Sequence, residues 1–269
     1  MRTIVHLSDL HFGRVNHPVV APLIEAIARI APDLVAVSGD LTQRARSRQF
    51  KDARAFLDRL PTPQIVVPGN HDVPLHNVAA RFLRPLRHFR RFITDDLRPF
   101  YADDEIAVLG VNTARSLTIK DGRINEAQIA WMSERLSACD SGLVKIVVTH
   151  HPFDVPEGHG ERDLVGRARM AMEALARSGA DLFLAGHLHV SHTSPSATRY
   201  KIKGHSALVV QAGTAASTRG RGEENSFNVL RIDRPQIAVE RVEWQPENGE
   251  FGLVMREQFR HTPDGWVPL

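Results

Sequence analysis

The chain has 269 residues and a formal net charge of +3, with 42% hydrophobic and 24% charged residues. This composition is typical of a globular protein with a sizeable core, and the charge alone is too small to indicate nucleic-acid binding. The single cysteine, Cys139, excludes an internal disulfide, and no apolar run approaches the ~18 residues of a membrane span. Because the N-terminus also lacks a secretory cleavage pattern, we expect a cytoplasmic protein.

The first part of the chain predicts strands and helices in alternation. Short apolar runs predict the strands, and apolar residues at helical spacing predict the helices. The expected strands are 3–7, 34–37 and 65–67, and the expected helices are 19–30 and 47–60. Pro32 ends the first helix, and Pro61 ends the second. This βαβαβ succession predicts parallel strands joined by right-handed crossovers.

The segment 73–101 has a different pattern. Its apolar residues fit one helical face, and they are Phe82, Leu86, Phe89, Ile93 and Leu97. Most of its arginines lie on the other face, and Pro85 either starts the helix or kinks it. One interpretation is an amphipathic helix packed on the core, with a solvated basic face. The alternative is a helical cap beside a functional site, whose basic helix 82–98 meets an anionic substrate or makes a peripheral membrane contact.

The second half predicts further strands and helices and then a strand-rich end. We expect strands at 106–111, 143–148 and 182–185, a helix capped by Asn125 that ends near Ala138, and a helix over 164–177. Alternating or apolar runs at 207–211, 226–232, 237–242 and 253–259 predict an antiparallel sheet. No linker or repeat interrupts residues 1–269, so we predict a single domain. A C-terminal strand could extend a sheet between subunits, which leaves a homodimer open.

Five polar clusters each follow an apolar run. They are Asp9-x-His11, Gly39-Asp40, Gly69-Asn70-His71-Asp72, His150-His151 and Gly186-His187-x-His189. Carboxylates, imidazoles and an amide oxygen together suit Mn, Fe, Zn or Ni better than Mg or Ca, which prefer oxygen alone. A glycine stands one or two positions before several of these groups, as a sharp turn close to an ion requires. One such pair is weak evidence, but five in strand-end positions predict one metal-binding edge.

In this order, the five clusters resemble the calcineurin-like metallophosphoesterase superfamily over about residues 1–192. The length and the doubled His150-His151 are similar to the class III cyclic-nucleotide phosphodiesterase branch, which also includes enzymes acting on glycerophosphodiesters. The resemblance implies a four-layer αββα sandwich, an α/β and α+β arrangement with a helical cap segment near 73–101. It also implies two divalent metal ions, Mn, Fe or Zn, and a small-molecule phosphodiester substrate.

The resemblance assigns a role to each matching residue. One metal would be held by Asp9, His11 and His189, the other by Asn70, His150 and His187, and Asp40 would bridge them. His71 would face the scissile phosphate and protonate or stabilise the leaving oxygen, and Asp72 is placed to orient His71. A hydroxide between the metals would attack phosphorus in line with the leaving group.

The sequence leaves open the roles of three residues and the identity of the substrate. His151 is expected behind the metals or facing substrate, and Arg219 and Arg221 are expected either in a solvated turn or in contact with a substrate anion. Many cyclic-nucleotide members have an arginine where this chain has Val73-Pro74-Leu75-His76. The first-choice substrates are 3′,5′-cyclic nucleotides, and the alternatives are glycerophosphodiesters or lipid-linked phosphates. A monoesterase, a nuclease and a catalytically silent scaffold are the remaining hypotheses.

Overall fold

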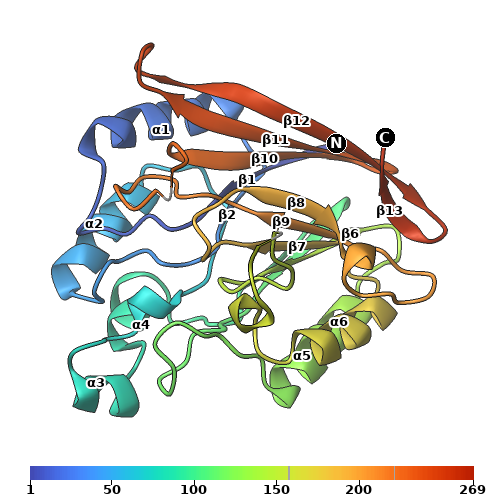
Figure 1. Cartoon of the computed structure of the whole chain (residues 1–269), viewed down its shortest axis with the longest axis horizontal. Coiled ribbons are helices and arrows are strands. Elements are labelled where there is room, and N and C mark those ends of the chain that lie inside the picture. Colours follow the sequence, from blue (N-terminus) through green and yellow to red (C-terminus); the bar gives the residue numbers. More distant parts are fainter. Residues whose placement is uncertain (157, 221) are drawn as a thin grey trace.

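Two β-sheets lie face to face because each presents an apolar face to the other. A computed structural model describes residues 1–156, 158–220 and 222–269. In the core between the sheets, Ile4 and Leu34 of one sheet belong to the same buried cluster as Val108 and Ile146 of the other. Helices cover both outer faces (Figure 1). The predicted αββα sandwich is therefore confirmed.

The first sheet joins the N-terminal strands to the C-terminal ones. Its strands, in spatial order, are β13 (Gly265–Pro268), β12 (Glu250–Thr262), β11 (Gln236–Gln245), β10 (Ser226–Asp233), β1 (Arg2–Leu7), β2 (Leu34–Val37) and β3 (Gln64–Val66). β1, β2 and β3 are parallel, as predicted, and α1 (His17–Ile30) and α2 (Ser47–Leu57) connect them. The short strand β13 was not predicted. α2 ends three residues earlier than predicted, although Leu60 is still buried.

The second sheet contains one strand whose pairing we predicted wrongly. Its spatial order is β4 (Phe100–Ala102), β5 (Ile106–Gly110), β6 (Val144–Val148), β7 (Leu182–Ala185), β9 (Leu208–Gln211) and β8 (His192–Pro195). We expected 207–211 in an antiparallel sheet, but β9 runs parallel to β7 and is antiparallel only to β8. Helices α5 (Glu126–Ser137), capped by Asn125 as predicted, and α6 (Ala168–Arg177) cover its outer face.

The cap segment forms two short helices instead of one. α3 (Val78–Leu83) and α4 (Arg87–Phe92) are separated at Arg84 and Pro85. Proline lacks an N–H donor and disfavours helical backbone in the residue before it, so the helix is interrupted there. Leu86 and Phe89 are buried, as the amphipathic pattern predicts, but Phe82 is 54% exposed and does not pack on the core. None of the helices in the described part of the chain is long and apolar enough to cross a membrane.

Short 3-10 turns lie in the loops that join these elements. They are η1 (Asn70–Asp72), η2 (Glu161–Asp163) and η3 (Ser196–Thr198). η1 directly follows β3 and carries one of the predicted polar clusters. The carboxyl ends of β1, β2 and β3 face the same edge as those of β6 and β7, because the residues that follow these strands contact one another.

Candidate metal centre

Left-handed backbone marks the loops at this edge. Residues other than glycine rarely adopt positive φ, and clusters of such strained residues occur at functional sites. Five of the predicted metal ligands have this backbone: Asp9 (φ 54°), His11 (47°), Asp40 (51°), His187 (76°) and His189 (61°). All five follow strands β1, β2 or β7. The turns therefore aim these side chains at one place, at a cost in local conformational energy.

Two glycines allow the loops to touch. A Cβ on Gly69 would lie 2.1 Å from Oδ1 of Asp40, and a Cβ on Gly186 would lie 1.7 Å from Oγ of Ser8 and 2.6 Å from Oδ2 of Asp9. Real side chains do not approach this closely. Glycine is therefore required at both positions because the polar groups of the neighbouring loop occupy that space.

The first donor set consists of Asp9, His11 and His189, whose ligand atoms all lie within 4.8 Å of one another. Oδ1 of Asp9 is 3.4 Å from Nε2 of His11 and 3.6 Å from Nε2 of His189. The other nitrogen of His189, Nδ1, is 2.7 Å from the Thr214 hydroxyl, which fixes the ring. Oδ2 of Asp9 accepts from the backbone N–H of His187 at 2.9 Å, so Oδ1 remains for the site.

The first set fits a cation. Oδ1 of Asp9 and Nε2 of His11 are buried and have no hydrogen-bond partner among the described residues. Buried polar atoms without partners are rare and costly in folded proteins, and they need an explanation such as an ion. A carboxylate and two imidazoles are a donor set that binds transition metals. The unpaired atoms point toward one another, as ligands of one ion would.

The second set gathers around His150. Its Nε2 lies 3.1 Å from Oδ1 of Asn70 and 3.3 Å from Nδ1 of His187. Nδ1 of His150 donates to the Ser38 carbonyl at 2.8 Å, which leaves Nε2 for the site. The amide nitrogen of Asn70 donates to the Ile119 carbonyl at 3.2 Å and so turns Oδ1 toward His150. These three side chains offer two imidazole nitrogens and one amide oxygen.

Asp40 lies between the two sets. Its Oδ2 is 3.8 Å from Nε2 of His11 and 3.4 Å from Nε2 of His150. Its Oδ1 accepts from the backbone N–H of His71 at 2.8 Å. Burial opposes the ionisation of Asp40, but His150 and His11 outweigh it and hold the pKa of this carboxyl well below its usual range. Asp40 is thus an ionised oxygen donor in reach of both sets.

The histidines respond differently to this environment. Burial lowers the pKa of His187 to about 3 and that of His189 to about 4, so both are neutral near pH 7. Burial also acts to lower the pKa of His150, but the Asp40 carboxylate outweighs it and raises that pKa to about 9. Metals bind neutral imidazole, so a cation at this place would displace the proton of His150.

His71 and Asp72 do not form the pair that the sequence suggested. Nδ1 of His71 is 3.0 Å from the Gln43 carbonyl and donates to it, while Nε2 lies 3.0 Å from Nη1 of Arg219. The Asp72 carboxylate instead accepts from the backbone N–H groups of Leu41, Thr42 and Gly69 and from the Thr42 hydroxyl. The prediction that Asp72 orients His71 is therefore wrong, because the Gln43 carbonyl already holds the nitrogen that a carboxylate would contact.

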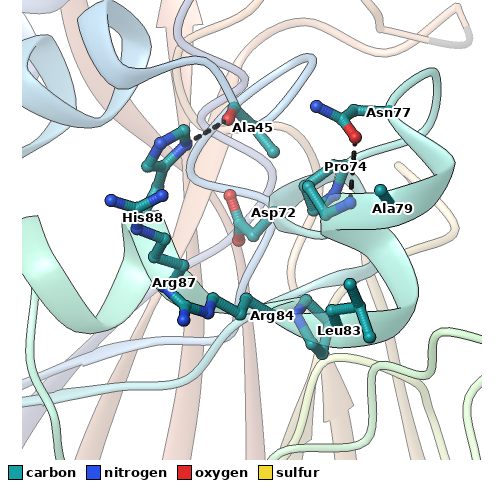
Figure 2. Close-up of a pocket in the computed structure, with 11 residues that line it drawn as sticks. Ala45, Asp72, Pro74, Asn77, Ala79, Leu83, Arg84, Arg87 and His88 are labelled. Atoms are coloured by element: carbon teal, nitrogen blue, oxygen red, sulfur yellow. Dashed lines mark hydrogen bonds between the residues drawn. The ribbon is translucent and has the colours of Figure 1, made fainter.

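Asp72 lies beside a cavity under the cap. Figure 2 shows its carboxylate beside a cavity of about 430 Å³ under the cap, which Arg84, Arg87 and His88 also line. Burial and the nearby Asp40 raise the pKa of Asp72 to about 6. Its hydrogen bonds join the loop after β2, which carries Asp40, to the loop after β3, which carries Asn70 and His71. Asp72 thus connects two loops of the site.

His151 belongs to the support of the site. It lies close enough to His150 and His187 to be considered a metal ligand. However, its Nε2 donates to the Lys120 carbonyl at 2.7 Å, and its Nδ1 accepts from the Thr113 hydroxyl at 2.8 Å. Because both nitrogens are used and the side chain is buried, the predicted substrate contact of His151 is not supported. The alternative expectation, a place behind the metal ligands, agrees with these contacts.

Arg219 is brought to the site by the turn after β9, where Nη1 contacts His71. Arg221, predicted with it as a substrate-binding residue, lies outside the described residues. Arg219 also lines a cavity of about 300 Å³ with Asp40, His187, His189, Lys120 and Arg162. No sequence signal marks Lys120 and Arg162, because both stand in loops with no motif around them.

The comparisons with known proteins agree with this geometry. A family model described as "Calcineurin-like phosphoesterase" matches residues 2–191. A relative from Enterobacter lignolyticus, named glycerophosphodiester phosphodiesterase GpdQ, is 30% identical over 60% of this chain, and the match spans 60% of that relative's length. A Synechococcus protein named probable cyclic nucleotide phosphodiesterase is 26% identical over 70% of this chain and 73% of its own.

A dimetal phosphatase from Danio rerio is similar in structure, with a TM-score of 0.67 at 14% identity over 97% of this chain and 99% of that one. A purple acid phosphatase from yellow lupin has the same TM-score and identity over 95% of this chain and 53% of its own. At such identity these two likenesses show the fold alone.

Proposed function

Because the chain belongs to the calcineurin-like phosphoesterase family, we propose that it is a dinuclear metal-dependent phosphodiesterase. The position of Asp40 carries the proposal. Its Oδ2 faces both His11 and His150, so one carboxylate oxygen is in reach of two donor sets. The names of two relatives, a glycerophosphodiester phosphodiesterase and a probable cyclic nucleotide phosphodiesterase, support diesters as the substrate class. The first-choice substrates are 3′,5′-cyclic nucleotides, and glycerophosphodiesters are the alternative.

The donor sets divide the two ions between them. Asp9, His11 and His189 would hold one divalent cation, Asn70, His150 and His187 the other, and Asp40 both. The imidazole and carboxylate donors favour Mn, Fe or Zn. When bound, such a pair of cations polarises phosphoryl oxygens and makes water a nucleophile at neutral pH. The chain's own part is to fix the ring orientations through Ser38 and Thr214 and to hold Asp40 through the backbone of His71.

His71 and Arg219 form the other half of the site. Nδ1 of His71 donates to a backbone carbonyl, so Nε2 is the atom that exchanges a proton with the departing oxygen. Burial lowers the pKa of His71, and the positive Arg219 adds to that effect. Arg219, 3.0 Å from Nε2, stabilises negative charge on the phosphoryl group or the leaving oxygen.

Activity of the metal-loaded protein tests this proposal. Wild-type protein given Mn²⁺ should hydrolyse bis-(p-nitrophenyl) phosphate and, with greater efficiency, one class within a panel of cyclic nucleotides and glycerophosphodiesters. Asp40→Asn, which keeps the shape but removes the charge, should lower kcat/KM by at least about a hundredfold. Asp52→Asn, on the exposed face of α2, is the matched control and should be unchanged. Equal activity of Asp40→Asn and wild type would refute the role of Asp40.

A specific observation favours lipid-linked phosphates as a second candidate substrate. Large apolar side chains are exposed on α3 and on the loop beside it: Val78 (65%), Phe82 (54%), Leu83 (79%), Leu117 (84%) and Ile119 (61%). The buried Arg81 joins these two segments, because its guanidinium donates to the carbonyls of Pro74, Arg115, Ser116 and Thr118. An exposed apolar rim followed by the arginines of α4 matches an anionic lipid surface.

Vesicle binding separates the two candidates. If lipid-linked phosphates are the substrates, the protein should sediment with phosphatidylglycerol vesicles, less with phosphatidylcholine vesicles and less at high salt. Phe82→Ser together with Leu83→Ser should abolish sedimentation, whereas Met170→Ser, which alters an exposed apolar residue on α6, should not. If the double variant and the control variant sediment with the vesicles to the same extent, the cap is not the part of the protein that contacts the lipid.

A further inference from the structure

Two cavities meet at His71. The cavity of about 300 Å³ on one side contains Asp40, His187 and His189, and is the place of the phosphoryl group. The other cavity, of about 350 Å³, is lined by Gln43, Val73 and Leu75. Both are lined by Asn70, His71, Lys120 and Arg219. Because His71 handles the departing oxygen, the second cavity, here called the leaving-group cavity, receives the alcohol that departs.

The described charged residues that line the leaving-group cavity are all positive. Its charged lining residues are Arg14, Arg44, Arg81, Lys120 and Arg219, and no carboxylate lines it among the described residues. The metal-side cavity differs, because Asp121 and Asp163 line it together with its cations. Among the described residues, the charged lining of the leaving-group cavity is thus entirely positive, whereas that of the metal-side cavity is mixed.

Lys120 and Arg219 also line the metal-side cavity, so the cations left to bind the leaving alcohol are Arg14, Arg44 and Arg81. Arg81 is excluded because its guanidinium is occupied by four backbone carbonyls. Arg14 and Arg44 are exposed, and neither forms an ion pair with a carboxylate of the described residues. A guanidinium presents several N–H donors in a plane that matches the oxygens of a carboxylate or phosphate.

The backbones of both arginines are fixed relative to His71. The N–H of Arg14 donates to the His11 carbonyl at 2.8 Å, and its own carbonyl accepts from Thr218 at 2.9 Å. Arg44 directly follows Gln43, whose carbonyl holds Nδ1 of His71, and the N–H of Arg44 donates to Oε1 of Gln49 at 2.9 Å. The two side chains therefore start from backbone positions that hydrogen bonds hold in place at the leaving-group cavity.

We propose that Arg14 and Arg44 bind a second anionic group on the leaving alcohol, so that the preferred substrate is a phosphodiester whose leaving alcohol carries a carboxylate or a phosphate. This inference rests on the proposed function, since hydrolysis defines which side departs. The bond between phosphorus and the leaving oxygen breaks, a water oxygen bonds to phosphorus, and a proton passes to the leaving alcohol. A simple 3′,5′-cyclic nucleotide has no second anion and would leave Arg14 and Arg44 unused, so this inference favours other phosphodiesters over the cyclic nucleotides that the sequence ranks first.

Isosteric substrate pairs test the proposal. Methyl 4-carboxyphenyl phosphate and methyl 4-carbamoylphenyl phosphate are nearly isosteric and differ in the charge of the aryl leaving group, and methoxide does not compete as a leaving group. Because the two phenols also differ in acidity, each kcat/KM is divided by the rate constant for hydrolysis of the same substrate by hydroxide. We expect kcat/KM to favour the carboxylate by about tenfold, as one charged hydrogen-bonded pair provides. In the double variant Arg14→Gln with Arg44→Gln this ratio should fall to about one. The control is Arg29→Gln, which changes an exposed arginine in the last turn of α1, just before β2 begins. This variant should keep the wild-type ratio.

A binding measurement makes the test independent of turnover. The benzylphosphonate analogues of the two substrates, in which CH₂ replaces the bridging oxygen, cannot be hydrolysed and can be titrated by calorimetry. A tenfold tighter binding of the carboxylate analogue that the double variant loses would support the proposal. Equal binding of both analogues to wild type, or a preference that the double variant keeps, would overturn it. Preferential binding without hydrolysis of either substrate would refute the proposed function and leave the anion site in place.

Discussion

Replacement of Asp72 by alanine tests whether this residue connects two loops of the site. The change removes the acceptor for three buried backbone N–H groups and the Thr42 hydroxyl. Four charge-assisted hydrogen bonds at about 1.5 kcal/mol each amount to about 6 kcal/mol. Burial and Asp40 raise the pKa of Asp72 to about 6, so its ionisation opposes folding by about 3 kcal/mol at pH 8. The expected net loss of unfolding free energy is therefore about 3 kcal/mol at pH 8.

The pH dependence of that loss has a defined sign. A carboxyl whose pKa is raised by folding stabilises the fold most at low pH, and that contribution falls as pH rises through about 6. The difference in unfolding free energy between wild type and Asp72→Ala should thus be about 1.5 kcal/mol larger at pH 5 than at pH 8. Urea unfolding of the metal-free proteins measures it, with Asp52→Ala as the exposed control.

The contrary outcome for Asp72 is also defined. If Asp72 acted on His71, as its position in the sequence suggests, Asp72→Ala would keep its stability and shift the pH profile of hydrolysis instead. A stability difference below about 0.5 kcal/mol at both pH values would refute the loop-connecting role.

Three further predictions concern single positions around the site. Gly186→Ala places a methyl group on the Ser8 hydroxyl and should weaken metal binding by about tenfold or more. The control Gly160→Ala changes an open position and should bind metal as wild type does. Equal metal affinity of the two variants would contradict this prediction. Arg81→Met keeps the apolar stem but leaves four carbonyls without a donor, so hydrogen exchange of 115–121 should accelerate relative to wild type and to the exposed control Arg59→Met. Burial lowers the pKa of His6 to about 3, so the stability that the fold gains from keeping this imidazole neutral is lost as the pH falls below about 6.5. His6→Gln should reduce the loss of unfolding free energy between pH 7 and pH 4 by about 3 kcal/mol, while the exposed control His17→Gln should match wild type.

The regular part of the fold was predictable because it depends on local pattern. The bounds of β2 and β7 agree with their apolar runs, and α5 begins after Asn125, whose side chain accepts from the N–H of Gln128. The convergence of the donor clusters was also predictable, because parallel strands place their carboxyl ends at one edge. Asp9 and His187 are separated by 178 residues, yet they are joined by a 2.9 Å hydrogen bond.

The remaining differences come from tertiary contacts that no local pattern encodes. Asp72 follows His71 in sequence, but the turn η1 directs its carboxylate toward Leu41 and Thr42. After β7 the chain first forms the edge strand β8 and then turns back as β9, which lies between β7 and β8 and is parallel to β7. Apolar periodicity does not reveal this strand order. The sequence spacing places Phe82 on the same helical face as Leu86 and Phe89, but the helix breaks at Pro85, so Phe82 does not pack on the core.

The central claim is that Asp40 joins two metal sites. Anomalous diffraction from crystals soaked in Mn²⁺ locates such ions directly. We predict two peaks about 3.5–4 Å apart, one beside Asp9, His11 and His189, the other beside Asn70, His150 and His187, with the Asp40 carboxylate between them. A single peak that touches one set only, or ions bound away from Asp40, would contradict it.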